Sequence, residues 1–232
     1  MSTTSDAGPP PGPRPRASGG ERAQRLAQLA FTALVLRPFM ALVIGLRVRG
    51  REHLPERDPF ILIANHASHL DTASLLSLFP LSRVGRIRPC AAADYFEASR
   101  LRSWLSHAGF NILSIPRRGF HAGEHPIRLM TSALARGESL ILFPEGTRGQ
   151  GGELSALKPG IAHLIEAAPG VPVVPAWLTN TSRALPKGEF LPVPIFCEVR
   201  IGPAFHPAGT REQIMAQVHA ALEQLAPAPA HA

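Results

Sequence analysis

The feature that most constrains the fold of this chain is an alternation of short apolar runs with longer amphipathic segments after Gly50. Short apolar runs between turn residues are typical of buried strands, and the amphipathic segments are typical of helices. The pattern predicts strands at residues 46–48, 60–64, 112–115, 140–143, 171–177 and 197–201. It predicts helices at residues 72–79, 97–108, 126–136, 160–168 and 211–225. The predicted fold class is therefore α/β, with a mixed, mostly parallel sheet flanked by helices.

The most apolar stretch, residues 26–46, precedes this domain and is about long enough to span a bilayer. Arg37 and Pro38 interrupt it near the middle. A charge is costly inside a membrane, and proline breaks the helical hydrogen-bond ladder. We therefore expect two short interfacial helices or one half-inserted hairpin. A true span, a signal peptide introduced by Arg22 and Arg25, and an ordinary buried helix are the alternatives.

The composition divides the chain into four parts. Residues 1–21 and 226–232 are rich in Pro and small residues, so we expect them to be disordered tails. Residues 22–46 are expected to be a membrane-associated helical segment, and residues 47–225 a single globular domain.

The charge of the chain indicates anionic partners. A net charge of +7 and a pI of about 10.8 suit nucleic acid, anionic lipid or phosphate-bearing substrates. Aromatic residues make up only 6%, with a single Tyr, whereas nucleic-acid platforms usually stack bases on aromatic rings. We therefore expect no nucleic-acid partner. The two cysteines, Cys90 and Cys197, lie far apart and form no CxxC pair, so neither a zinc site nor a redox couple is expected.

The first candidate catalytic group follows the predicted strand at 60–64. Ser68 and Asp71 have the spacing of a capping box, which would start a helix near His69 and leave His66 in the preceding turn. Two residues five apart within a helix would point roughly 140° away from each other, but from the turn His66 is able to fold back to Asp71. The carboxyl group would fix the imidazole tautomer, and His66 would act as a general base. The alternatives are that Asp71 merely caps the helix, or that His69 is the base or shares a metal with His66.

The second group of candidates surrounds the predicted strand at 140–143. The turn that follows contains Glu145, Gly146, Thr147 and Arg148, and the planar guanidinium of Arg148 suits phosphate. Glu145 would orient Arg148 or accept a hydrogen bond from a substrate hydroxyl. Lys158 precedes a predicted helix start, where backbone N–H groups also attract anions.

A third strand end brings two more cations. The predicted strand at 112–115 leads into Arg117 and Arg118, so three strand ends are expected to gather a histidine, a carboxylate and several cations. Each of these arginines, taken alone, is equally well explained as a solvated surface charge.

These residues resemble the glycerophospholipid acyltransferase family, whose best-known members are 1-acylglycerol-3-phosphate acyltransferases. Four blocks correspond in order. The first, residues 65–71, contains an HxxxxD signature, and the third, residues 143–148, reads Phe-Pro-Glu-Gly-Thr-Arg. Residues 111–117 and 171–175 are similar to the second and fourth. The resemblance implies that His66 is the base, that Asp71 is its partner, and that the second and third blocks bind the acceptor.

The second and third blocks depart from the family pattern. Asn111 stands where the family usually has Gly, Pro116 where an acidic residue is common, and Gly149 where Ser is usual. The catalytic pair is unchanged, so these departures bear on which acceptor is used.

The resemblance implies transfer of a fatty acyl chain from acyl-CoA or acyl-carrier protein to a lysophospholipid, with no cofactor and no metal. It also implies contact with membrane lipids, and we expect the cytoplasmic face of the inner or plasma membrane. Neither a GxSxG elbow nor a cysteine motif indicates a covalent intermediate. Three alternatives stay open: another acceptor such as a lyso-aminolipid or glycolipid, a hydrolase, and a non-catalytic lipid-binding module.

Overall fold

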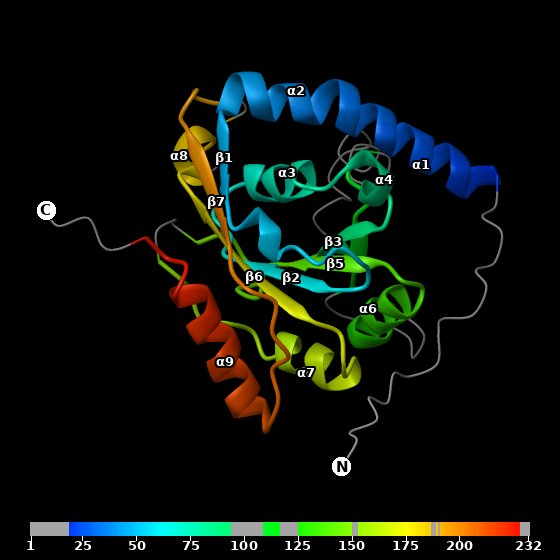
Figure 1. Ribbon diagram of the computed structural model, residues 1–232, viewed down its shortest axis with the longest axis vertical. Helices are drawn as coiled ribbons and strands as arrows, with labels where there is room; N and C mark the ends of the chain where they lie inside the picture. Colours follow the sequence, from blue (N-terminus) through cyan, green and yellow to red (C-terminus); the bar gives the residue numbers. More distant parts are fainter. Residues whose placement is uncertain are drawn as a thin grey trace, which may run out of the picture.

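The computed structural model describes residues 19–93, 109–116, 125–149, 153–186, 189 and 191–227. In these residues a seven-stranded sheet is covered by helices on both faces (Figure 1). The predicted helix at 97–108 and most of the two expected tails lie outside the described residues.

The sheet has the order β1-β7-β6-β2-β5-β3-β4. Its strands are β1 (Leu46–Arg49), β2 (Ile61–Ala64), β3 (Ile87–Ala92), β4 (Leu113–Ile115), β5 (Ser139–Leu142), β6 (Val173–Thr179) and β7 (Cys197–Ile201). Every neighbouring pair is parallel except β6 and β7. The predicted mixed, mostly parallel sheet is confirmed.

The helices form layers on the two faces of the sheet. They are α3 (Leu70–Ser77), α4 (Leu81–Val84), α6 (Pro126–Ala135), α7 (Gly160–Ala167), α8 (Thr181–Ala184) and α9 (Arg211–Glu223), with a 3-10 turn at Arg51–His53. Helices α6, α7 and α9 cover one face, while α3, α4 and the N-terminal helix cover the other (Figure 1). In β2, Leu62 joins the second of these cores and Ile63 the first, because successive strand side chains point to opposite faces.

Strand β3 is absent from the sequence prediction. Pro89 lies in its middle, where proline is unusual for an inner strand. The structure accommodates Pro89 at a change of partner. Residues Ile87 to Pro89 pair with β5, whereas Cys90 and the two residues after it pair with β4.

The expected break at Arg37 and Pro38 is wrong. The chain is helical from residue 19 to residue 44, through α1 (Gly19–Phe31), a π-helical turn (Thr32–Leu36), α2 (Arg37–Phe39) and a second π-helical turn (Met40–Ile44). Local π geometry is a known way to keep proline inside a helix, because the ladder shifts rather than stops. Here the N–H of Arg37 donates to the carbonyl of Thr32. The Arg37 guanidinium donates to the Phe79 carbonyl at 2.6 Å, which places the charge against the protein.

The π turns also keep one face of this helix on the domain. The buried residues recur every fourth position: Gln28, Thr32, Leu36, Met40 and Ile44. In a regular α-helix such a stripe would rotate by roughly 160° over sixteen residues. A π turn takes up an extra residue and so cancels this drift.

The opposite face of the same helix is apolar and exposed. Leu34 is 76% exposed and Leu42 85% exposed. Residues Arg25–Ile44 are long and apolar enough to cross a membrane by length and composition, and 28% of that apolar window is buried inside the protein. The N-terminal helix therefore packs on the domain with one face and exposes an apolar surface on the other.

Candidate active site

The side chains of His66 and Asp71 meet at the carboxyl end of β2. His66 lies two residues after the strand and before α3, whose N-cap is His69. Its Nδ1 is 2.8 Å from Oδ2 of Asp71. The contact expected from the sequence is thus present, because His66 lies in the turn and not on the helix.

Asp71 is completely buried, and a single oxygen makes its hydrogen bonds. Oδ2 accepts the backbone N–H groups of Ala67 at 2.7 Å and Ser68 at 2.8 Å in addition to His66. Among the described residues, Oδ1 has no partner. With Nδ1 of His66 as the donor to this crowded oxygen, the lone pair on Nε2 stays available to accept a proton.

The predicted capping box is only half formed. The Asp71 carboxyl group reaches back to the Ser68 N–H as predicted, but the Ser68 hydroxyl accepts from Leu70 N, at 3.3 Å, in place of Asp71 N. The helix therefore starts at Leu70. Asp71 both caps this turn and holds His66, so the helix-capping role and the role as partner of the histidine are compatible.

The loop after β5 fixes the position of His66. The His66 N–H donates to Oε1 of Glu145 at 2.7 Å, and its carbonyl accepts from the N–H of Gly149 at 2.8 Å. Its ring stacks on Phe143, with centroids 4.1 Å apart and planes at 18°. Strands β2 and β5 are paired neighbours, so the two loops meet at the same edge of the sheet.

Glu145 has a different position from the one expected. It is 2% exposed, and its second oxygen, Oε2, accepts the N–H of Ser155 at 3.0 Å. Both oxygens are therefore engaged by backbone N–H groups. Among the described residues it is His69, and not Glu145, that contacts Arg148, with 2.7 Å between Nε2 of His69 and Nη1 of the arginine.

The two candidate phosphate-binding cations are Arg148, which lies in this loop, and Lys158, which lies beside it. Lys158 donates its N–H to the carbonyl of Pro144 at 2.8 Å, and its side chain lies against Gly146. Gly146 has a φ of 72°, a left-handed conformation that favours glycine. Thr147 and Lys158 are exposed, and Arg148 is half-buried. The turn therefore presents its polar side chains outward near His66.

Arg117 lies outside the described residues. The strand that precedes it, β4, is separated from β5 by β3, so the ends of β4 and β5 lie about 10 Å apart. Of the three strand ends that were predicted to lie together, those of β2 and β5 are therefore direct neighbours, and that of β4 is more distant.

Sequence reasoning missed two residues that hold this site. The Asn65 side chain accepts from the N–H of Leu178 at 2.7 Å and donates to its carbonyl at 3.0 Å, which ties the end of β2 to β6. Phe143 supplies the ring under His66. The signal available for Asn65 was an amide directly before the histidine; nothing local pointed to the stacking of Phe143.

Neither thiol is poised to act as a nucleophile. Burial raises the pKa of Cys90 to about 12 and that of Cys197 to about 11. Within the residues that the structure describes, no three His, Cys, Asp or Glu side chains are grouped to hold a metal ion. The expectation that no metal or cofactor is needed stays a prediction.

Comparison with known proteins identifies relatives. The family model for acyltransferases matches residues 45–179. The chain is 34% identical over 154 residues to a 1-acyl-sn-glycerol-3-phosphate acyltransferase of Limnanthes douglasii, covering 66% of this chain and 52% of that protein. It is 30% identical over 162 residues to 1-acyl-sn-glycerol-3-phosphate acyltransferase alpha of Homo sapiens, covering 69% and 54%. The chain thus spans about half the length of these curated relatives.

A solved structure has the same fold. The crystal structure of the 1-acyl-sn-glycerophosphate (LPA) acyltransferase PlsC from Thermotoga maritima superposes with a TM-score of 0.69 at 22% identity. The match covers 90% of this chain and 83% of that one. At this identity the likeness concerns the fold.

Proposed function

Because this chain belongs to the acyltransferase family, we propose that it moves a fatty acyl chain from a thioester donor to the free hydroxyl of 1-acylglycerol-3-phosphate, giving phosphatidic acid. The donor would be acyl-CoA or acyl-carrier protein. The observation that carries the proposal is the 2.8 Å contact between His66 and Asp71 at the strand edge that also presents Arg148.

The proposed chemistry needs no covalent enzyme intermediate. Nε2 of His66 takes the proton of the acceptor hydroxyl as its oxygen attacks the thioester carbonyl carbon. The C–S bond breaks, and the leaving thiolate takes up the proton from the imidazolium. Asp71 holds the ring in the required tautomer throughout.

We assign acceptor binding to polar groups in and beside the loop that holds the backbone of His66. Arg148 and Lys158 would bind the phosphate, together with Gly146 and Thr147 of the same turn. We assign Glu145 to positioning the backbone of His66, because both of its oxygens are already occupied. We assign Arg117 to the acceptor site because of the family resemblance alone.

We further propose that the enzyme works at a membrane surface, attached by the exposed apolar face of its N-terminal helix. Both substrates carry acyl chains, so this location would bring the acceptor to the site from the lipid phase. The cytoplasmic face of the inner or plasma membrane remains the proposed location.

The deciding experiment measures transfer from labelled long-chain acyl-CoA or acyl-carrier protein with and without 1-acylglycerol-3-phosphate. Wild type should give an acceptor-dependent diacyl product. His66→Ala should lose it, and His219→Ala, which alters a half-exposed histidine on α9, should keep it. Acyl release without an acceptor would instead identify a hydrolase. Product formed only with another lysolipid would show that this lysolipid is the acceptor. No turnover with any donor or acceptor would indicate a lipid-binding module.

A further inference from the structure

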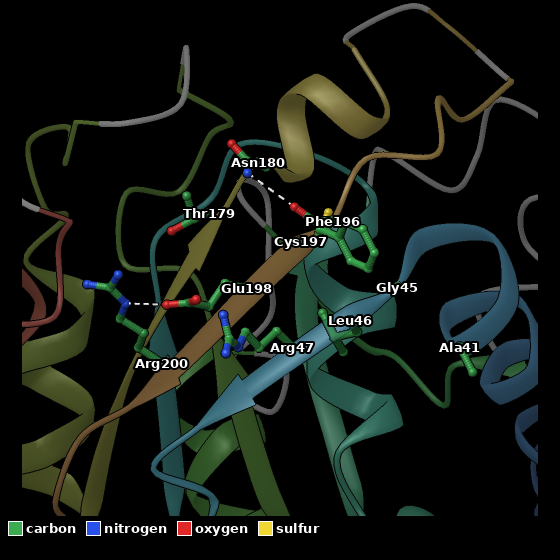
Figure 2. Close-up of a pocket in the computed structure, with 10 residues that line it drawn as sticks. All are labelled: Ala41, Gly45, Leu46, Arg47, Thr179, Asn180, Phe196, Cys197, Glu198 and Arg200. Atoms are coloured by element: carbon green, nitrogen blue, oxygen red, sulfur yellow. Dashed lines mark hydrogen bonds and ion pairs between the residues drawn. The ribbon is translucent and has the colours of Figure 1, made fainter. Parts of the chain in front are cut away.

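A hollow lies where the end of the N-terminal helix meets the strands β1 and β7 at one side of the sheet (Figure 2). Its volume is about 830 Å³. Its apolar wall is made by Ala41, Leu46 and Phe196, and its charged wall by Arg47, Glu198 and Arg200. Leu46 lies on the sheet face that the N-terminal helix covers and Arg47 on the opposite face, so the hollow reaches around the edge strand β1. We call this hollow the arginine–Phe196 groove.

The apolar wall is continuous with an exposed apolar surface. Phe196 is 80% exposed, although its ring lies directly on the backbone of Gly45, where an added Cβ would come within 2.7 Å of it. Leu42, next to Ala41 in the chain, is 85% exposed. Large apolar side chains gathered on a surface mark an interaction site more often than isolated ones do.

The charged wall has an excess of positive charge. Glu198 accepts from Nε of Arg200 at 2.5 Å and lies 3.4 Å from Nε of Arg49. Arg47 is next to Glu198 in the β1–β7 register (Figure 2), and its guanidinium makes no hydrogen bond with the described residues. The hydrogen bond from Arg200, with the charges of Arg49 and Arg47, holds the pKa of Glu198 below its usual value. Three guanidinium groups thus surround one carboxylate.

An alternative explanation is that charged side chains on an edge strand deter pairing with the strands of other chains. This would explain the presence of Arg47 and Arg49. It would not account for the exposed Phe196 that lines the same hollow as Arg47. A ligand that satisfies both walls has an anionic phosphate next to an apolar part. Guanidinium groups bind phosphate with two parallel hydrogen bonds, and the aromatic ring suits the boundary between headgroups and acyl chains.

We propose that the arginine–Phe196 groove binds an anionic phospholipid of the bilayer surface, with the phosphate at Arg47 and Arg200 and the acyl region at Phe196. The enzyme would then hold the membrane through two contacts, the apolar helix face and this groove. The second contact makes attachment selective for anionic lipids. The proposal concerns membrane binding only, so it does not depend on the acyl-transfer chemistry.

The test is cosedimentation of the full chain with vesicles of phosphatidylcholine alone or mixed with phosphatidylglycerol. The double variant Arg47→Gln, Arg200→Gln should bind the anionic vesicles about tenfold or more weakly than wild type, and the neutral vesicles equally well. The matched control, Arg136→Gln with Arg211→Gln, removes the same charge from two exposed arginines, at the C-cap of α6 and at the start of α9. It should bind both vesicles nearly as wild type does.

Phe196→Ser should weaken binding to both vesicle types, because the apolar contact does not depend on headgroup charge. Equal losses in the two double variants would overturn the proposal, since diffuse charge would then explain the binding. Wild-type binding of neutral vesicles by Phe196→Ser would overturn it as well. The proposal would also be overturned if the double variant Arg47→Gln, Arg200→Gln bound vesicles normally but lost affinity for acyl-carrier protein. The groove would then be a binding site for an acidic protein.

Discussion

The backbone N–H of His66 donates to Oε1 of Glu145 across 79 residues of sequence, at 2.7 Å. The carboxyl group is buried and bridges this N–H to that of Ser155. The third sequence block therefore supports the first by holding its backbone, and the polar groups that it offers to substrate are the ones further along, above all Arg148.

Glu145→Gln tests this support. The new amide accepts through one oxygen only, so one of the two backbone N–H groups is left without a partner, at a cost of about 1–3 kcal/mol. We expect kcat to fall by about tenfold to a hundredfold with little change in the KM of the acceptor. Steady-state kinetics checks this, with Glu166→Gln on α7 as the exposed control. A change confined to KM would show that Glu145 touches the acceptor.

Asp71→Asn should keep the position of the His66 ring but lower turnover. The amide oxygen has to take the place of Oδ2, because Ala67 and Ser68 donate to it, so His66 keeps its tautomer but loses the negative charge that stabilises its protonated ring. We expect kcat to fall by about tenfold to a hundredfold, the rate equivalent of a hydrogen bond to a charged group, while vesicle binding is retained. Asp71→Ala should in addition lower the unfolding free energy by about 1–3 kcal/mol, because Ala67 and Ser68 lose their acceptor. Near-normal turnover of Asp71→Asn would remove the carboxyl group from the mechanism.

Arg148→Ala should act on acceptor binding. Loss of a charged hydrogen bond costs about 1.5–3 kcal/mol, so the KM for 1-acylglycerol-3-phosphate should rise by about tenfold or more. The KM of a phosphate-free monoacylglycerol should not change. Arg136→Ala, on the α6 side of the sheet, is the control. If both acceptors are affected equally, Arg148 does not recognise the phosphate.

Gly146→Ala should destabilise the turn. An alanine at φ 72° costs about 1–2 kcal/mol, and its Cβ would lie 3.2 Å from Cγ of Lys158. We expect a lower melting temperature together with weaker acceptor binding. Gly160→Ala at the start of α7, where an added Cβ meets nothing within 4 Å, should be neutral or slightly stabilising. Equal melting temperatures for the two variants would contradict this account.

The buried thiols predict a loss of stability at alkaline pH. Desolvation, with a smaller effect of the Asp71 charge, raises the pKa of Cys197 from 9.0 to about 11. The unfolded thiol ionises first, so its contribution is complete below about pH 9 and is lost as the pH rises toward 11. Urea titrations across this window should show a shallower decline for Cys197→Ala than for wild type. An identical pH dependence would mean that the thiol is not shielded from solvent.

The amino-acid sequence by itself determined most of the architecture and which residues could do chemistry. Apolar periodicity placed β1, β2, β5 and β7 to within a residue or so, because buried strands and amphipathic helices must repeat their apolar positions. The spacing of His66 and Asp71 around a helix start was enough to predict their contact, since both lie within one local turn.

Tertiary structure decided what depends on partners distant in sequence. Only the pairing of β2 with β5 puts Glu145 behind His66 and Phe143 under its ring. Strand β3 forms around Pro89 because its first half pairs with β5 and its second half with β4. The N-terminal helix stayed continuous through Pro38 because its π turns pack on α3. Local propensity carries no information about such contacts, because their free energy comes from groups that the chain brings together only on folding.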